Sequence, residues 1–372
     1  MSQQSDLLLI DRPDELEKLI SRLRNLPYVA LDTEFIRERT FYPQLCLVQL
    51  AHGRENACID VLTIKDITPL LEYLADTHIL KVLHSARQDL ELLYHLTGHV
   101  PGPVFDTQIA MGLLGHDLQL SYAAMIASLF DIELDKSLAR ADWARRPIDP
   151  ALLRYAADDV QFLAEAYPKL EQALSERQRL PWLVQECQSL TQPTLYRPDP
   201  ESSWRRVRGA GNLDRQALAV LMDLAAWRED QAMSRDRPRQ WILKDSSLVA
   251  LARIRPERKD QLVEVRGLNE TFLRRHADKL LKICRSTRPT DAPDVCENRR
   301  PDVIEQNAFD ELRRFVKTRA DELGINASLL APRTEVKKLL RGDPECALLN
   351  GWRFEVIGRD LVQRTERKQG PA

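Results

Sequence analysis

The stretch YVALDTEF, residues 28–35, is the feature that most constrains how this chain can fold. Its apolar and β-branched residues predict a buried strand, yet Asp32 and Glu34 place two carboxylates inside it. Alternate residues of a strand share a face, so the two acids point one way and Leu31, Thr33 and Phe35 point the other. Like charges on a buried surface repel each other and are costly to desolvate. An edge strand with solvated acids is the alternative, which the apolar neighbours disfavour.

Residues 1–200 alternate strand-like and helix-like segments, which is typical of an α/β domain. We expect strands at 28–35, 45–51, 56–61 and 80–85, and helices at 14–23, 67–76, 87–96, 121–130 and 149–174. Asp149 and Pro150 are good start signals for the last of these helices. The first three strands follow one another through short connections, whereas the fourth follows a helix. This order predicts an antiparallel meander within a mixed sheet rather than a purely parallel sheet.

Beyond residue 200 the pattern is helical throughout. Prolines and polar residues interrupt it near 191–203 and again near 285–302, and both stretches are predicted linkers. At 372 residues the chain exceeds the size of one hydrophobic core. We therefore expect an α/β domain over 1–200, followed by two small all-α units over 208–290 and 300–372.

Composition excludes some classes of protein. No apolar run reaches the length of a membrane span, and the N-terminal stretch lacks the pattern of a signal peptide. Six scattered cysteines without C-x-x-C spacing are typical of reduced thiols in a cytoplasmic protein. Residues 1–200 carry 19 Lys and Arg against 29 Asp and Glu, whereas residues 201–290 carry 20 against 12. The basic segment suits contact with a polyanion, although ordinary surface charge explains it equally well.

Two further acids are predicted to face the same interior as the strand acids. On the helix expected at 87–96, Asp89 shares a stripe with leucines, whereas Glu91 falls on the polar side. On the helix at 149–174, Asp159 faces inward with Tyr155 one turn before it, and Asp158 faces outward. Taken alone, Asp89 is more simply a first-turn acid that interacts with the helix dipole.

The acids are informative as a set. Asp32, Glu34, Asp89 and Asp159 come from three elements, and no Lys or Arg shares their stripes. Carboxylate oxygens are the ligands of hard divalent cations such as Mg²⁺ and Mn²⁺. Two such ions about 4 Å apart clamp the attacking and leaving oxygens of a phosphoryl displacement. The sequence therefore predicts a metal-dependent phosphodiester chemistry.

Three motifs carry a family resemblance. LDTEF, HSARQDLELL and YAADDV resemble the exonuclease motifs of the DEDD superfamily, in the DEDDy form that has Tyr-x-x-x-Asp as its third motif. Residues 20–170, with FDTQIA among them, are similar to the ribonuclease D family. LAAWREDQAMSRDRPRQWILKDSSLVALA is similar to an HRDC domain (helicase-and-ribonuclease-D C-terminal), and the unit from about Asn307 onward fits that pattern less well.

This resemblance implies a ribonuclease-H-like fold and 3′→5′ exonucleolytic hydrolysis of RNA to nucleoside 5′-monophosphates. The implied substrates are tRNA precursors with 3′ extensions and other small structured RNAs, and the implied form is a monomer. The four acids would hold two Mg²⁺ or Mn²⁺ ions, and Tyr155 would contact the attacking water. Because an unperturbed tyrosine has a pKa of about 10, we expect the phenol to orient the water and the metal to acidify it.

Other residues are weaker candidates for substrate contacts: Thr33, Phe35, His84, Arg235, Arg237 and Arg239. A place in the core is the simpler interpretation of Phe35 and His84. The three arginines interleave with Trp241, a combination suited to phosphate contact and base stacking, although a core position is the simpler interpretation of Trp241.

Two other functions remain open. A DNA proofreading 3′→5′ exonuclease would use the same carboxylate set. A catalytically inactive nucleic-acid-binding scaffold is the other, which the intact set of four acids with Tyr155 disfavours.

Overall fold

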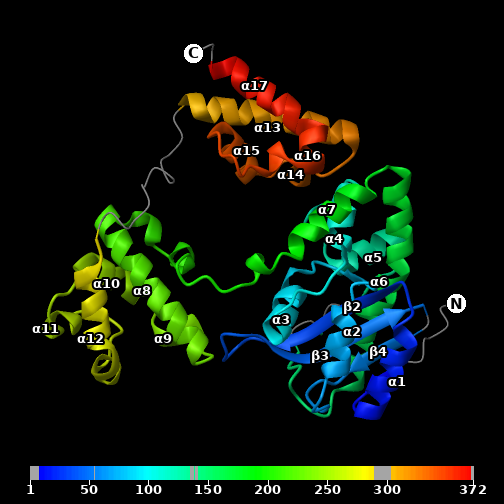
Figure 1. Ribbon diagram of the computed structural model, residues 1–372, viewed down its shortest axis with the longest axis horizontal. Helices are drawn as coiled ribbons and strands as arrows, with labels where there is room; N and C mark the ends of the chain where they lie inside the picture. The colour runs from blue at the N-terminus through cyan, green and yellow to red at the C-terminus, as the bar shows by residue number, and fades with distance from the viewer. Residues whose placement is uncertain (1–7, 54, 135–137, 139–140, 289–302, 370–372) are drawn as a thin grey trace. The chain divides into compact units, whose positions relative to one another are not determined.

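The computed structural model describes residues 8–53, 55–134, 138, 141–288 and 303–369 (Figure 1). The chain divides into two compact units. The sheet unit comprises Met1–Ile36, Leu45–Tyr196 and Pro301–Ala372, and the helical unit comprises Arg37–Gln44 and Arg197–Arg300. The expected linker and domain limits near 290–300 lie outside the described residues.

A mixed six-stranded sheet forms the centre of the sheet unit. Its order is β1-β4-β3-β2-β5-β6. β1 pairs in parallel with β4, β2 with β5 and β5 with β6, whereas β3 and β4 are antiparallel. The strands are β1 Leu8–Ile10, β2 Tyr28–Ile36, β3 Gln44–His52, β4 Glu55–Ile59, β5 Leu80–Leu83 and β6 Val104–Asp106. The mixed sheet is confirmed, and the edge-strand alternative for β2 is wrong, because β2 lies between β3 and β5.

Helices cover both faces of this sheet (Figure 1). Val29 and Leu31 of β2 pack into one core with α1, α2 and α3, whereas Ala30 points into the other core with α4, α5 and α6. The Asp149 side chain accepts a hydrogen bond from the Ala151 amide, so the predicted cap of α6 is confirmed. The helices are α1 Pro13–Leu23, α2 Thr68–Ala75, α3 Arg87–Thr97, α4 Thr107–Leu113, α5 Tyr122–Phe130, α6 Pro150–Glu176 and α7 Leu180–Leu190.

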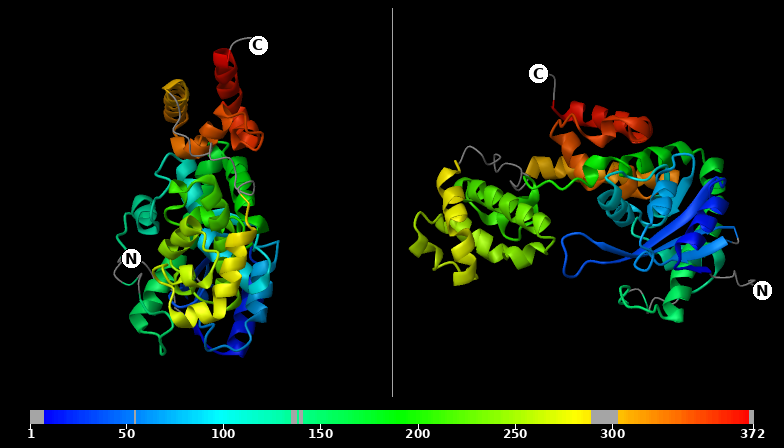
Figure 2. Two further views of the ribbon diagram at one scale, coloured as in Figure 1. Left: turned by 90° about the vertical axis from the view of Figure 1, so that its left-hand side faces the viewer. Right: turned by 60° about the horizontal axis from the view of Figure 1, so that its bottom comes forward.

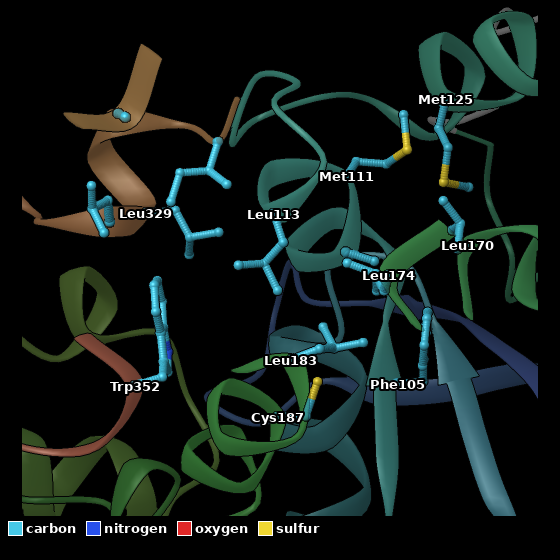
Figure 3. Packing of buried hydrophobic residues seen from close by; sticks show 14 of the residues in the cluster. Phe105, Met111, Leu113, Met125, Leu170, Leu174, Leu183, Cys187, Leu329 and Trp352 are labelled. Carbon is cyan, nitrogen blue, oxygen red and sulfur yellow. The ribbon is translucent and has the colours of Figure 1, made fainter. Parts of the chain in front are cut away.

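The C-terminal helices extend the core of the sheet unit. Leu329 and Trp352 belong to the same buried cluster as Leu113 and Leu183 (Figure 3). The helices are α13 Val303–Leu323, α14 Ala327–Leu330, α15 Arg333–Leu340, α16 Gly351–Arg353 and α17 Arg359–Gln369, with a π-helical stretch Phe354–Gly358 before the last. These described helices share a core with α4 and α7. The expectation of a second all-α domain over 300–372 stays a prediction.

Trp352 is the centre of this contact with α7. Its ring stacks on that of Trp182 with centroids 4.8 Å apart and an angle of 11° between the planes. Its indole Nε1 donates a 2.7 Å hydrogen bond to Glu186, whose carboxylate also accepts from Arg353. Trp352 is only 4% exposed. Stacking, burial and a satisfied indole nitrogen together hold α16 on α7.

The helical unit has its own core. It contains α8 Arg215–Ser234, α9 Arg239–Ile242, α10 Asp245–Ile254, α11 Lys259–Leu262 and α12 Glu270–Ser286 (Figures 1 and 2). Leu221, Leu224, Leu251 and Leu280 are fully buried among these helices. Within the described part of the chain, no helix of either unit combines the length and the apolar character that a membrane span requires.

We predict that Trp352→Ala lowers the free energy of unfolding by about 3–5 kcal/mol, because the substitution leaves a cavity against Trp182 and removes a hydrogen bond. Urea unfolding followed by circular dichroism measures this loss. Trp241→Ala is the matched control, because Trp241 is 60% exposed and its truncation should change stability by at most about 0.5 kcal/mol. A loss below about 1 kcal/mol for Trp352→Ala would contradict the packing described.

Candidate active site

Three acids meet where β2 passes α6. Carboxylate oxygens of Asp32, Glu34 and Asp159 lie within 4.8 Å of one another, and all three side chains are partly buried. Asp32 and Glu34 share a face of β2 because strand side chains alternate, and Asp159 comes from the N-terminal half of α6. The structure therefore brings together three of the four predicted acids as one cluster.

Electrostatics in this cluster oppose ionisation. Burial and repulsion from Asp32, Asp159 and Asp89 raise the pKa of Glu34 to about 9. Burial raises the pKa of Asp159 to about 7, and burial together with Asp159 raises the pKa of Asp32 well above its usual range. Without a compensating cation, the cluster therefore retains protons near neutral pH.

The fourth acid, Asp89, adjoins the cluster. It lies in the first turn of α3 and is 7% exposed, so the predicted inward orientation is confirmed. The Thr33 hydroxyl donates a 2.5 Å hydrogen bond to its Oδ1. Burial and the charge of Asp32 raise the pKa of Asp89, which shows that the two carboxyl groups interact. Thr33 of β2 thus links the strand to α3, a role that the sequence does not indicate.

Tyr155 lies one helical turn before Asp159. Its phenol donates a hydrogen bond to the Asp159 carboxylate, and its ring lies 6.3 Å from that of Trp143. Burial and the neighbouring carboxylates raise the pKa of Tyr155 above its usual value of 10. The side chain is therefore a protonated phenol at neutral pH, able to donate a hydrogen bond but not to act as a base.

Polar contacts fix the N-terminal half of α6 against the sheet. The guanidinium of Arg146, in the loop before α6, donates two 2.7 Å hydrogen bonds to Asp60, which follows β4. Within the helix, the Ala157 carbonyl accepts from Asn56 of β4. The Asp158 carbonyl accepts from the Tyr122 hydroxyl of α5. These contacts set where Tyr155 and Asp159 lie.

Asp106 fixes the position of the start of α3. Its carboxylate accepts hydrogen bonds from the amides of Ser85 and Ala86 at the start of α3, and from those of Gln108 and Ile109 at the start of α4. One buried side chain thereby satisfies free amides of two helices. The sequence reasoning missed this role, although an Asp directly before a helix start is an N-cap signal.

The weaker candidates differ in their surroundings. Phe35 packs against the core on the α1–α3 side of the sheet, which agrees with the core interpretation. The His84 ring nitrogens lie 2.9 Å from the Thr107 hydroxyl and 3.0 Å from the Leu120 carbonyl, so both have partners within the protein. Trp241 is 60% exposed, so the expectation of a core position for it is wrong: α9 is one turn long and its buried residue is Ile242.

The three arginines are not equivalent. Arg235 and Arg237 are exposed. Arg239 forms a bidentate pair with the buried Glu229, at 2.5 and 2.6 Å. Contact of these arginines with RNA stays a prediction, and for Arg239 it would compete with an existing ion pair.

Comparisons with known proteins agree with this geometry. The sequence profile of the 3′-5′ exonuclease family matches residues 8–175, and that of the HRDC domain matches residues 217–284. A ribonuclease D of Sphingobium indicum is 37% identical over 366 residues, which cover 96% of this chain and 94% of that protein. A ribonuclease D of Pseudomonas paraeruginosa is also 37% identical, over 92% of this chain and 93% of its own length.

The chain belongs to the ribonuclease D family. Its fold agrees: the crystal structure of Escherichia coli ribonuclease D, described as an exoribonuclease involved in structured RNA processing, superposes over 100% of both chains with a TM-score of 0.85 at 30% identity. The catalytic core of Trypanosoma brucei RRP6 matches 76% of this chain with a TM-score of 0.59 at 25% identity. The protein is a ribonuclease D-type 3′→5′ exoribonuclease.

The acid cluster of this ribonuclease D fits divalent cations. Its donors are all carboxylates, the ligands that Mg²⁺ and Mn²⁺ prefer, and they converge within 4.8 Å. Their raised pKa values come from burial and mutual repulsion, both of which a bound cation offsets. Asp32, Glu34 and Asp159 would hold such an ion, with Asp89 alongside.

We predict that the metal-free protein loses stability as pH rises from about 6 to about 9. Carboxyl groups of the unfolded chain have pKa values of about 4, whereas Glu34 and Asp159 have values of about 9 and about 7 in the folded state. The folded protein therefore binds more protons than the unfolded chain over this range. The resulting stabilisation is complete below about pH 4 and is lost as pH rises through the folded values.

Thermal unfolding in a chelator across this pH range measures the effect. Glu34→Gln is the control, because a neutral amide cannot titrate, and its unfolding temperature should fall less steeply with pH. Excess Mg²⁺ should also flatten the wild-type slope. Equal slopes for the wild type and Glu34→Gln in chelator would contradict the assignment.

Proposed function

We propose that this ribonuclease D hydrolyses RNA from its 3′ end, releases nucleoside 5′-monophosphates, and uses two divalent ions, Mg²⁺ or Mn²⁺. The observation that carries the proposal is the convergence of Asp32, Glu34 and Asp159 within 4.8 Å, with Asp89 hydrogen-bonded alongside through Thr33. An in-line displacement at phosphorus needs positive charge near both the attacking and the leaving oxygens.

Each residue has a separate task in this proposal. Asp32, Glu34, Asp89 and Asp159 hold the cations, which when bound acidify the attacking water and stabilise the leaving 3′ oxygen. Tyr155 orients that water through its phenol, because its raised pKa keeps the proton in place. Asp106 and the Asp60–Arg146 pair act through position alone, since they hold the helices on which Asp89, Tyr155 and Asp159 lie.

For the substrate we propose tRNA precursors with 3′ extensions and other small structured RNAs. Support comes from the E. coli ribonuclease D, which is described as acting in structured RNA processing, and from the excess of Lys and Arg over residues 201–290. A polyanionic substrate matches a basic unit that accompanies an acidic catalytic unit. We further propose that the protein is a monomer and that it acts in the cytoplasm. The free thiols of the five described cysteines agree with a reducing compartment.

Product analysis on a 3′-extended tRNA tests this function directly. With Mg²⁺ or Mn²⁺ we expect nucleoside 5′-monophosphates and progressive shortening from the 3′ end, and with a chelator no cleavage. Asp32→Asn should lower the rate by at least about a thousandfold while the fold survives, because several kcal/mol of transition-state stabilisation depend on the bound charge. Tyr155→Phe should lower it less. An Asp32→Asn variant with the wild-type rate would refute the metal assignment.

A DNA 3′→5′ exonuclease is the runner-up, because the same carboxylates serve both sugars. Matched RNA and DNA oligonucleotides separate the two activities, and faster hydrolysis of DNA would exclude the RNA assignment. The scaffold alternative predicts no product from either oligonucleotide.

We predict that Arg235 and Arg237 contribute phosphate contacts. Replacing both with Gln should weaken RNA binding about equally for all sequences. It should also reduce the slope of log affinity against log salt by about 1 to 2, because RNA binding releases fewer counterions when fewer phosphates are contacted. Filter binding across a salt series measures the slope. Arg239 is left unchanged, since its loss would also leave Glu229 unpaired. Unchanged affinity and slope would end this part of the proposal.

A further inference from the structure

The loop between β2 and β3 belongs to the helical unit. Residues Arg37–Gln44 cluster with Arg197–Arg300, although both ends of the loop continue into strands of the sheet. Phe41, near the middle of the loop, is 5% exposed and is part of the core formed by α8, α10 and α12. An ordinary hairpin connection would be expected to leave such a residue in solvent.

One carboxylate holds the loop. Oδ1 of Asp236 accepts a 2.9 Å hydrogen bond from the amide of Phe41 and a 3.0 Å hydrogen bond from the amide of Tyr42. Asp236 has a φ of +46°, a left-handed conformation that Asp and Asn tolerate better than most residues. Two charge-assisted hydrogen bonds to successive amides bind a backbone segment firmly.

An ion pair supports the same place. The guanidinium of Arg239 lies 4.4 Å from the centre of the Phe41 ring and is oriented by its bidentate pair with Glu229, which is 1% exposed. Inside the loop, Arg37 Nε donates to the Phe41 carbonyl at 3.1 Å, and Thr40 donates to the Tyr42 carbonyl at 2.6 Å. The loop is therefore internally stiffened where it enters the core.

The loop is also the direct continuation of the strand that carries two acids. Glu34 precedes the end of β2 by two residues, and the loop begins at Arg37. The chain therefore links the helical unit to the sheet unit at both ends of this loop and also at both ends of the segment Arg197–Arg300. A chain attached at several points has fewer accessible arrangements than one attached through a single flexible linker.

We propose that Asp236 is a positioning residue, which through the Arg37–Gln44 loop couples the RNA-binding helical unit to the acid-bearing strand β2. The coupling rests on the proposed exoribonuclease function. It matters for RNAs long enough to contact both units, whereas a dinucleotide can occupy the acid cluster alone. Arg239 and Glu229 support the coupling by holding the Phe41 ring.

Two substitutions at Asp236 separate the hydrogen bonds from backbone effects. Asp236→Gly permits the positive φ without strain but removes the acceptor. Asp236→Asn retains both the acceptor oxygen and the tolerance of this conformation, and removes only the charge. The full-length variants are compared on a 3′-extended tRNA and on an RNA dinucleotide, with Mn²⁺ present.

For Asp236→Gly we expect kcat/KM on the tRNA to fall about tenfold and that on the dinucleotide to stay at the wild-type value. Amide hydrogen exchange at Phe41 and Tyr42 should rise by about tenfold or more, because these two amides lose their acceptor. Asp236→Asn should restore both readouts towards the wild type.

Equal losses on the two RNAs, or no loss on the tRNA despite faster exchange at Phe41 and Tyr42, would overturn the coupling. Unchanged exchange would also overturn it, because the hydrogen bonds would then not hold the loop. Failure of the proposed function has a different signature, since the wild type would then release no nucleoside 5′-monophosphate from either RNA.

Discussion

Carboxyl groups of Asp32, Glu34 and Asp159 converge within 4.8 Å, at a place where burial also raises the free energy of their charged forms. An isolated strand would avoid this arrangement, because each ionised group makes the next harder to ionise. Protons relieve the repulsion when no metal is bound, and divalent cations relieve it when they bind. The proposed catalytic capacity of the cluster and its cost to folding therefore have the same origin.

Keeping the acids together requires that three elements keep their places. β2 is fixed by its interior position in the sheet and by cores on both faces. α3 is fixed by Asp106, and α6 by the Asp60–Arg146 pair. Asp106, Asp60 and Arg146 are not among the proposed metal ligands, yet each fixes the backbone of a helix from which a proposed ligand projects. Residues that position ligands without binding the metal themselves are typical of metal sites, where the orientation of ligands is as important as their identity.

Sequence patterns predicted the elements with strong periodicity. The central strands, the Asp149 cap and the inward orientation of Asp89 followed from alternation and helical spacing, because burial imposes those periods. β1 and β6 were missed, since three residues carry no period. The shared core of the C-terminal helices, the exposure of Trp241 and the capture of Phe41 by the helical unit depend on contacts between distant segments, which local patterns do not encode.

The most direct test of the cluster is a calorimetric titration of Mn²⁺ into the metal-free protein at pH 7, repeated in two buffers with different heats of ionisation. Because Glu34 has a pKa of about 9 without metal, binding should displace at least about one proton per chain. We expect saturable binding with an observed heat that differs between the two buffers, and we expect Asp32→Asn to lose both the binding and this difference. Binding without proton release, or the same binding by Asp32→Asn, would contradict it.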